Sequence, residues 1–387
     1  MRIYSQNDEE KIRAQGLVRE WQRSGLLQES QAAQIETELG VDLRRTNVFL
    51  RLLLFLFTTL VITVAALLIT KLFHVDGDVR VAAVCVFGGT LCLVTAEFLV
   101  RTFHLYRFGV EEAFAVAFTT LVTIAAGLLA PSKFAITGSG DFPMIAMLAA
   151  GALASLWIYL RFGYLYGAIA SLIHSVALPF PLALSGEARR LIAAVVCATV
   201  FAVVRRKRIA CGDDFPGDDY GAIQATAWVG VYLALNLYVG VYQHYQQSLF
   251  YWATYGSMWV LPVIGLWLAL PGKDRLLMNT SLAMALVTLL TNKPYLSLPR
   301  QPVDPILFGV LLIAAAVLIK RWLARGPDGQ RRGFTAVRLL SSDRRLLAIV
   351  GTASAALQPG APGSAAATAK PNFGGGRSGG AGASSSF

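Results

Sequence analysis

The sequence predicts an all-α fold, a polytopic bundle of transmembrane helices preceded by a small helical hairpin. Hydrophobic residues make up 55% of the 387 residues and charged residues only 15%, whereas about a quarter of a soluble domain is charged. Ten apolar runs, each about the length of a bilayer crossing, fill the chain from Val48 to Lys320. The clearest run, Leu52 to Thr70, contains no charge, and a hydrocarbon core of about 30 Å requires roughly 20 residues of helix.

Residues 1–46 are predicted to form a cytoplasmic hairpin of short helices. Ser5 to Asp8 fits a capping box at the start of the first helix. Ser24-Gly25 fits a helix stop, and a second helix is expected from about Glu29 to Leu39. Such a hairpin is too small to hold a large core alone. We therefore expect it to pack on a protein partner, on the membrane or on a second copy of itself.

Residues 47–324 are predicted to form the membrane bundle. Two of the expected spans are only 16 residues long, so a count of eight to ten spans is plausible. The spans are placed at 48–73, 79–100, 111–130, 142–160, 164–184, 189–204, 220–243, 255–270, 275–291 and 303–323.

The distribution of Lys and Arg predicts that both ends of the chain are cytoplasmic. Fifteen of these residues flank the spans on the side of the N-terminus and seven on the opposite side, and cytoplasmic loops carry the excess of positive charge. The run from Arg205 to Arg208 is the strongest single marker. The first apolar run starts at about residue 48, so an uncleaved signal-anchor in a bacterial inner membrane is expected.

The region after the last span is predicted to lie on the membrane and then to become disordered. Residues 325–358 combine Arg331-Arg332 and Arg344-Arg345 with leucines, a pattern typical of a basic amphipathic segment on anionic headgroups. Residues 359–387 are rich in Ala, Gly and Ser and offer little apolar surface to bury. The net charge of +11 is therefore interpreted as membrane topology and lipid attraction, and no nucleic-acid partner is expected.

The segment Trp21-Gln22-Arg23-Ser24-Gly25-Leu26-Leu27, followed by Gln31-Ala32-Ala33 and Leu39-Gly40, carries a family resemblance. It resembles the head of the bacterial polytopic membrane-protein family catalogued as domain of unknown function 2157. The resemblance covers roughly the first 100 residues. It implies a helical hairpin in front of membrane helices and brings no known activity. The end of the chain, Phe373 to Phe387, is similar to Gly-rich tails of several bacterial membrane-associated proteins, although Arg377 interrupts its glycines.

His174 is the strongest candidate for a functional side chain. It lies at the middle of the fifth predicted span, where a polar group is expensive and often functional. It shares a flank with small residues spaced by four, a pattern that favours close helix packing: Gly163, Gly167, Ser171 and Ser175. One interpretation is a hydrogen bond that holds the bundle together. The other is a proton or ligand site that includes Ser171.

Asn236 and Gln224 are the polar residues of the seventh predicted span. Interhelical hydrogen bonding is the favoured interpretation of both, and Asn236 is kept as a candidate binding residue.

Glu97 is expected to form an ion pair with Arg101, which is four residues later in the same helix. Carboxylates suit a helix N-terminus, so the two that open the third span are interpreted as anchors: Glu111 and Glu112.

One predicted external loop is unusually aromatic. The stretch from Tyr238 to Trp259 contains no Lys or Arg and many Tyr, Trp and Phe residues. An aromatic belt at the interface is the favoured interpretation. A short re-entrant or gating segment is the alternative.

No motif for catalysis or metal binding is present in the sequence. HExxH, GxSxG and P-loop patterns are absent. The four cysteines form neither a CxxC nor a Cys/His set. No catalytic residue, metal or cofactor is therefore expected, and a membrane enzyme is the least favoured class.

Two function classes remain after these exclusions. The favoured one is a scaffold or accessory protein that recruits partners through its cytoplasmic ends. The alternative is a small-molecule or ion transporter with a midplane site near His174, which Pro262 in the eighth predicted span supports. No repeat relates the first five predicted spans to the last five, which weighs against transport. The oligomeric state stays open.

Overall fold

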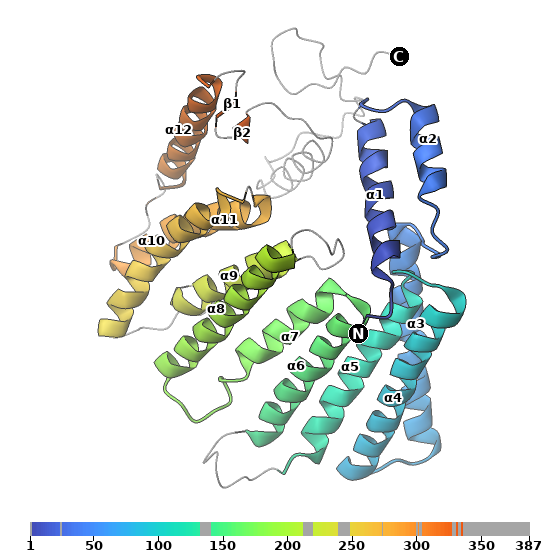
Figure 1. Ribbon diagram of the computed structural model, residues 1–387. Helices are drawn as coiled ribbons and strands as arrows, with labels where there is room; N and C mark the ends of the chain where they lie inside the picture. The colour runs from blue at the N-terminus through green and yellow to red at the C-terminus, as the bar shows by residue number, and fades with distance from the viewer. Residues whose placement is uncertain are drawn as a thin grey trace, which may run out of the picture. The chain divides into compact units, whose positions relative to one another are not determined.

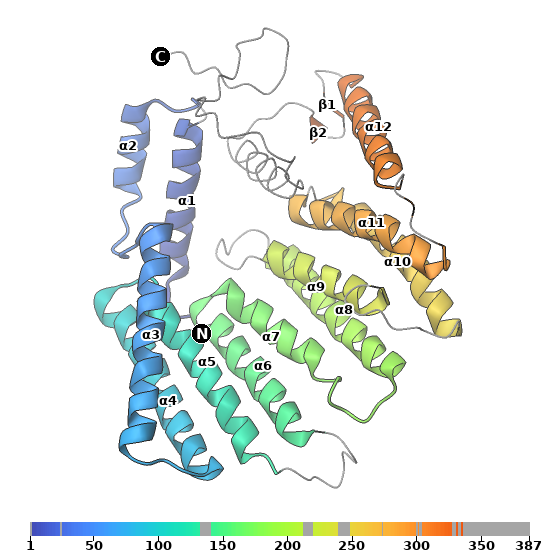
Figure 2. The ribbon, with the colours of Figure 1, turned by 180° about the vertical axis from the view of Figure 1, so that it is seen from behind.

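The computed structural model describes residues 2–23, 25–131, 141–211, 220–238, 248–272, 274–298, 301, 304–326, 330–331 and 334–335 (Figures 1 and 2). These residues form twelve helices and one pair of two-residue strands, β1 (Gln330–Arg331) and β2 (Phe334–Thr335), which pair antiparallel. The all-α class is therefore confirmed. The chain divides into two units, Met1–Ile319 and Lys320–Phe387.

The two head helices are α1 (Gln6–Arg23) and α2 (Glu29–Glu38). The Ser5 hydroxyl accepts a hydrogen bond from the Asp8 backbone N–H at 3.1 Å, which is one of the two bonds of the predicted capping box. The Asp8 carboxylate accepts from the Ser5 hydroxyl at 2.7 Å and not from the Ser5 backbone. Gly25 adopts a φ of +75°, and its N–H bonds to the Gln22 carbonyl. The predicted stop is thus confirmed at Gly25, while Ser24 lies outside the described residues.

Each of the ten predicted apolar runs contains one helix. Five of these helices, α3, α4, α5, α6 and α10, are long and apolar enough to cross a membrane, as expected of a membrane protein. Ten spans therefore stay a prediction. The bounds are α3 (Val48–Leu72), α4 (Asp78–Phe103), α5 (Val110–Leu129), α6 (Phe142–Phe162), α7 (Leu165–Ala177), α8 (Gly186–Cys211), α9 (Tyr220–Leu235), α10 (Leu249–Ala269), α11 (Arg275–Tyr295) and α12 (Asp304–Ala324).

The other helices differ from simple spans for physical reasons. α7 has 13 residues and α9 has 16, which is short of the roughly 20 residues that a bilayer requires. α8 has 26 residues, but Arg190 and Arg205 bound its apolar stretch. By contrast, α3 has no buried residue. A helix with apolar residues on all sides, packed on one side and exposed on the other, is suited to contact with lipid.

Two predicted spans end earlier than expected. The span predicted over 164–184 becomes α7, which stops at Ala177. Leu178 still has helical backbone angles, but Pro179 and Pro181 lack the N–H groups that would continue the helix. Gly163 caps α6 instead of belonging to this helix. The span predicted over 220–243 ends at Leu235.

The predicted aromatic loop is partly helical. α10 begins at Leu249, and the Ser248 hydroxyl accepts from the Tyr251 N–H at 3.3 Å, so the second half of the expected loop belongs to that helix. Residues 239–247 lie outside the described residues. The choice between an aromatic belt and a re-entrant segment stays open. Most of residues 325–358 and all of 359–387 also lie outside the described residues.

Most helices of the first unit pack on their neighbours in sequence. Contacts join each of α4 to α8 to the next helix, while α3 packs mainly on α5, and α11 packs on both α9 and α10. Figure 2 shows α4 to α7 as one row and α8 beside α9. Two principal cores result. One contains Ile158, Phe162 and Tyr164, and the other contains Trp228 and Met258.

A buried hydrogen-bond network joins α9 to α11. The amide of Asn236, which is fully buried, donates to the Tyr232 hydroxyl at 3.0 Å and to the Thr291 hydroxyl at 3.1 Å. Tyr232 and Thr288 share a hydrogen bond of 2.8 Å. The Tyr295 hydroxyl accepts from the Leu237 N–H at 2.8 Å. The predicted interhelical hydrogen bonding of Asn236 is confirmed, and a role in ligand binding stays a prediction.

We predict that Asn236→Ala lowers the free energy of unfolding by about 1–2 kcal/mol, because the buried hydroxyls of Tyr232 and Thr291 lose a partner. Asn279→Ala is the matched control, since Asn279 is exposed on α11. Reversible unfolding of the two variants in bicelles measures the difference. Equal losses would contradict the proposed importance of the network.

We also predict that Gly109→Ala is strongly destabilising. Gly109 has a φ of +108°, and an added Cβ would overlap the Arg51 carbonyl oxygen of α3. The backbone strain alone costs about 1–3 kcal/mol. Gly256→Ala is the control, because a Cβ there meets nothing within 4 Å. A thermal melt in detergent that is equally displaced for both variants would contradict this packing.

Candidate functional site

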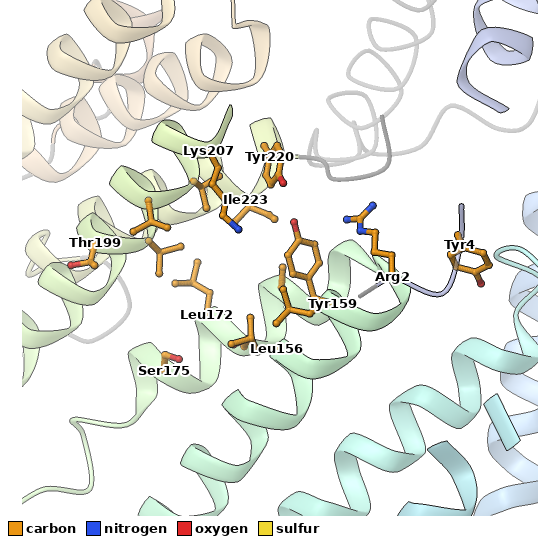
Figure 3. A pocket seen from close by; sticks show the side chains of 16 residues that line it. Arg2, Tyr4, Leu156, Tyr159, Leu172, Ser175, Thr199, Lys207, Tyr220 and Ile223 are labelled. Carbon is orange, nitrogen blue, oxygen red and sulfur yellow. The ribbon is translucent and has the colours of Figure 1, made fainter. Parts of the chain in front are cut away.

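A groove of about 750 Å³ lies between α6 and α7 on one side and α8 and α9 on the other (Figure 3). We call it the α6–α9 groove. Its volume falls within the range of about 300–1,000 Å³ that is usual for small-molecule sites. Its apolar wall consists of Leu156, Leu160, Leu172, Val200, Val203 and Val204.

The charged side chains of the α6–α9 groove lie at one end of it with two tyrosines, whereas the hydroxyls of Ser175 and Thr199 lie away from this end. Figure 3 shows Arg2, Tyr159, Lys207 and Tyr220 at this end, above Leu172. Lys207 forms no ion pair within the described part of the chain. The groove is therefore amphipathic, with two cations at one end of an apolar channel.

Arg2 reaches the groove because the start of the chain is fixed. The Ile3 N–H donates to the Arg161 carbonyl at 3.0 Å. Arg2 donates through Nη1 to the Glu9 carboxylate at 3.0 Å, and Glu9 is buried. Burial raises the pKa of Glu9 and outweighs the opposing effect of Arg2. The ion pair holds the guanidinium between the head and the groove.

A buried cluster of tyrosines lies next to the start of the chain. The Tyr4 hydroxyl donates to the Leu105 carbonyl at 3.2 Å and lies 3.3 Å from the Tyr164 hydroxyl. Burial raises the pKa of Tyr4 well above the usual value. Tyrosine is already protonated at neutral pH, so both phenols act as neutral hydrogen-bonding groups. This cluster fastens residues 2–4 to the ends of α4 and α6.

The predicted acidic anchors lie close to this cluster. The Glu111 carboxylate, fully buried in the first turn of α5, accepts from the Phe108 N–H at 2.6 Å. Glu112 accepts from Arg51 Nε at 2.7 Å and so ties α5 to α3. Their expected place at the N-terminus of this helix is confirmed. The partner Arg51 was not predicted.

Glu97 has one expected partner and one unexpected partner. Arg101 lies 3.1 Å away, which confirms the predicted pair. Arg161 donates through Nε to the same carboxylate at 2.7 Å and ties α6 to α4. Spacing along the sequence predicts ion pairs within one helix only. The sequence therefore did not predict the ion pair between Glu97 on α4 and Arg161 on α6.

A second groove of about 910 Å³ lies farther along the same helices. It is lined by residues of α6, α7, α8 and α9 that include Asp141, Val176, Arg190 and Gly230. Leu172 contributes to the walls of both grooves. The two cavities therefore follow each other along α7 and α8, with Leu172 common to both.

The predicted site residues do not come together. Ser171 lines the α6–α9 groove. His174 is not among the residues that line either groove, and its Nδ1 lies 2.7 Å from the Ala170 carbonyl oxygen. Asn236 belongs to the network between α9 and α11.

His174 was predicted at the middle of its helix, and this was wrong, because α7 stops at Ala177 and leaves His174 in the last turn. Its ring packs on α6, where an added Cβ at Gly151 would come within 2.6 Å of His174 Cδ2. Helix contact of this kind agrees with the packing interpretation. A midplane depth for His174 stays a prediction.

Sequence reasoning missed the polar end of the α6–α9 groove. Lys207 was interpreted only as part of a topology marker, and Arg2 was not singled out. Tyr159 and Tyr220 lie close to the ends of α6 and α9, where aromatic residues are common in membrane proteins. These four residues are far apart in sequence, so only the packing of the helices brings them together.

Comparisons with known proteins add no identification. No protein-family model matches the chain, and no curated protein or solved structure matches it. The resemblance of the head to the bacterial membrane-protein family stays a prediction. Within the described residues, no three His, Cys, Asp or Glu side chains are grouped as metal ligands.

Proposed function

We propose that this chain is an integral membrane protein that binds an amphipathic small molecule in the α6–α9 groove. The observation that carries the proposal is the division of one cavity into an apolar wall and a cationic end at Arg2 and Lys207. Pockets with apolar walls and a few placed polar groups bind ligands with the same division. This proposal moves the predicted small-molecule site from His174 to the groove lined by Ser171.

We place the protein in a bacterial inner membrane with the head on the cytoplasmic side. Lys and Arg are concentrated on the side of the head, as cytoplasmic loops require. The Arg44 N–H donates to the His104 carbonyl at 2.8 Å, and the Ile3 N–H donates to Arg161. The head, the end of α4 and the end of α6 therefore share one side. On this orientation, the cationic end of the groove faces the cytoplasm.

Transport along α7 and α8 is an extension of this proposal. The second groove continues the path on the other side of Leu172. A ligand that moves from one groove to the other requires a displacement of Leu172. We propose further that α7, α8, α9, α11 and α12 complete ten spans together with the five long apolar helices.

We predict that Ser171→Trp blocks ligand binding, because the indole fills space beside Leu172 in the groove. Ala202→Trp is the control, since Ala202 is exposed on α8 and lines neither groove. Labelling with a photoreactive lysophospholipid, followed by peptide mapping, measures occupancy. Ser171→Trp is expected to lower labelling of residues 156–160 and 200–204 by about tenfold, equivalent to about 1.4 kcal/mol. Equal labelling of the two variants would remove the proposal.

A second candidate function is the recruitment of a protein partner by the head. Three large apolar side chains are exposed at its free end, with exposed fractions of 39% for Leu17, 41% for Trp21 and 68% for Leu26. Exposed aromatic and apolar residues of this kind are typical of protein-binding surfaces. The fixed base of the head would hold this surface at a constant place above the membrane.

We predict that Trp21→Ala abolishes partner capture by a photo-crosslinking amino acid at position 26. Truncation of a central aromatic residue typically costs an interface about 2 kcal/mol or more. Gln22→Ala is the control, because Gln22 is exposed beside Trp21 and is not apolar. Affinity purification after crosslinking in native membranes compares the two. The same partners for both variants would argue against an adaptor role.

A further inference from the structure

We infer that the α6–α9 groove is a binding site for an anionic phospholipid, with the phosphate at Arg2 and Lys207 and an acyl chain along the apolar wall. The inference rests on the proposed function and names the ligand class of the same groove. Four features support it. They are the positive charge of the lining residues, the different partners of the cations on α8, the depth of the apolar wall and the opening of this wall toward the bilayer.

Among the described residues, the charged side chains that line the groove are both positive. They are Arg2 and Lys207. Glu9 pairs with Arg2 and is not among the lining residues. A guanidinium and an ammonium at one end of a cavity favour a phosphate, which both groups bind through charge-assisted hydrogen bonds.

The cationic side chains in the last turns of α8 contact different parts of the protein. Arg208 pairs with Asp274 and also donates to the Gln224 side chain at 3.4 Å. Arg205 donates to the Leu268 carbonyl at 3.5 Å. Both therefore contact the helices on the α10–α11 side. Lys207 instead lines the α6–α9 groove, so this cation is directed to the cavity.

The depth of the groove matches one leaflet of a bilayer. Thr199 and Lys207 both line it from α8, and eight residues of helix correspond to about 12 Å. Half of a hydrocarbon core of about 30 Å is about 15 Å. An acyl chain that lies in the groove therefore stays at the depth that it has in its own leaflet. Tyr159 and Tyr220 lie at the polar end, where tyrosines mark the interface of a bilayer.

The apolar wall is open to the side. Leu156, Leu160 and Val203 line the groove and are 40%, 48% and 51% exposed. Large apolar side chains on the outside of these helices face hydrocarbon in a membrane. A phospholipid can therefore enter from the bilayer with its chain first and does not have to cross water.

The test uses the full chain in phosphatidylcholine nanodiscs that contain a trace of photoreactive phospholipid. The probes are phosphatidylglycerol and phosphatidylcholine with the same diazirine-bearing acyl chain. Peptide mapping measures labelling of the wall segments 156–160 and 200–204. Peptides of α3 serve as the internal standard, because this helix has no buried residue. The variants are Lys207→Gln, its neighbour Arg206→Gln, which lines neither groove, Ser171→Trp and Ala202→Trp.

In the wild type, phosphatidylglycerol is expected to label the wall at least about fivefold more than phosphatidylcholine, since a basic residue near a membrane surface contributes about 1 kcal/mol toward an anionic lipid. Lys207→Gln should lower the phosphatidylglycerol signal about fivefold. Arg206→Gln should leave it unchanged. Unlabelled phosphatidylglycerol should compete, and inorganic phosphate at the same concentration should not.

Three results would overturn the inference without testing the proposed function. They are equal labelling by the two lipids, equal signals from Lys207→Gln and Arg206→Gln, and full competition by inorganic phosphate. If Ser171→Trp still removes labelling while Ala202→Trp retains it, the groove binds an amphiphile without selecting charge, and the proposed function survives. If these two Trp variants label equally, both the inference and the proposed function fail. Normal labelling of α3 excludes misfolding as the cause of any lost signal.

Discussion

The attachment of residues 2–4 to the bundle is the contact on which the account of this protein depends. The Ile3 N–H bonds to the end of α6, and Tyr4 enters the cluster formed with Tyr164 and the Leu105 carbonyl. The two contacts of Tyr4 are buried, and buried polar groups that lose partners carry a large penalty. The start of the chain is therefore held firmly on the bundle. Two consequences follow: the head has a fixed base, and Arg2 contributes to a groove whose other walls come from helices more than 150 residues away.

The need for hydrogen-bond partners also determines where the polar side chains of the bundle lie. Hydrocarbon supplies no hydrogen bonds, so a partner within the protein stabilises a buried polar group. Asn236 finds Tyr232 and Thr291, and Arg208 finds Asp274. Lys207 has no such partner within the described residues and lines the groove instead. This difference between neighbouring cations of one helix distinguishes a cation available to a ligand from those that hold the helices together.

The sequence was sufficient to predict the helices and insufficient to predict the groove. Apolar runs and helix caps located both head helices and a helix in each of the ten predicted spans, because these signals are local. Pro179 lies inside the span predicted over 164–184, but the prediction did not end the helix there. The observed α7 is therefore shorter than expected, and His174 is near its end. α9 ends one residue before Asn236, whose side chain bonds to α11, and this contact between helices leaves no pattern in the sequence. The groove combines Arg2 with residues of four helices, and no pattern in a single sequence records which helices pack together.

The most direct test of the central claim is an electron cryomicroscopy map of the full chain in nanodiscs that contain phosphatidylglycerol. The account predicts elongated density along Leu156 and Val203, with a headgroup between Arg2 and Lys207. A map in which the helices close the groove, or in which Arg2 and the head have left the end of α6, would contradict it.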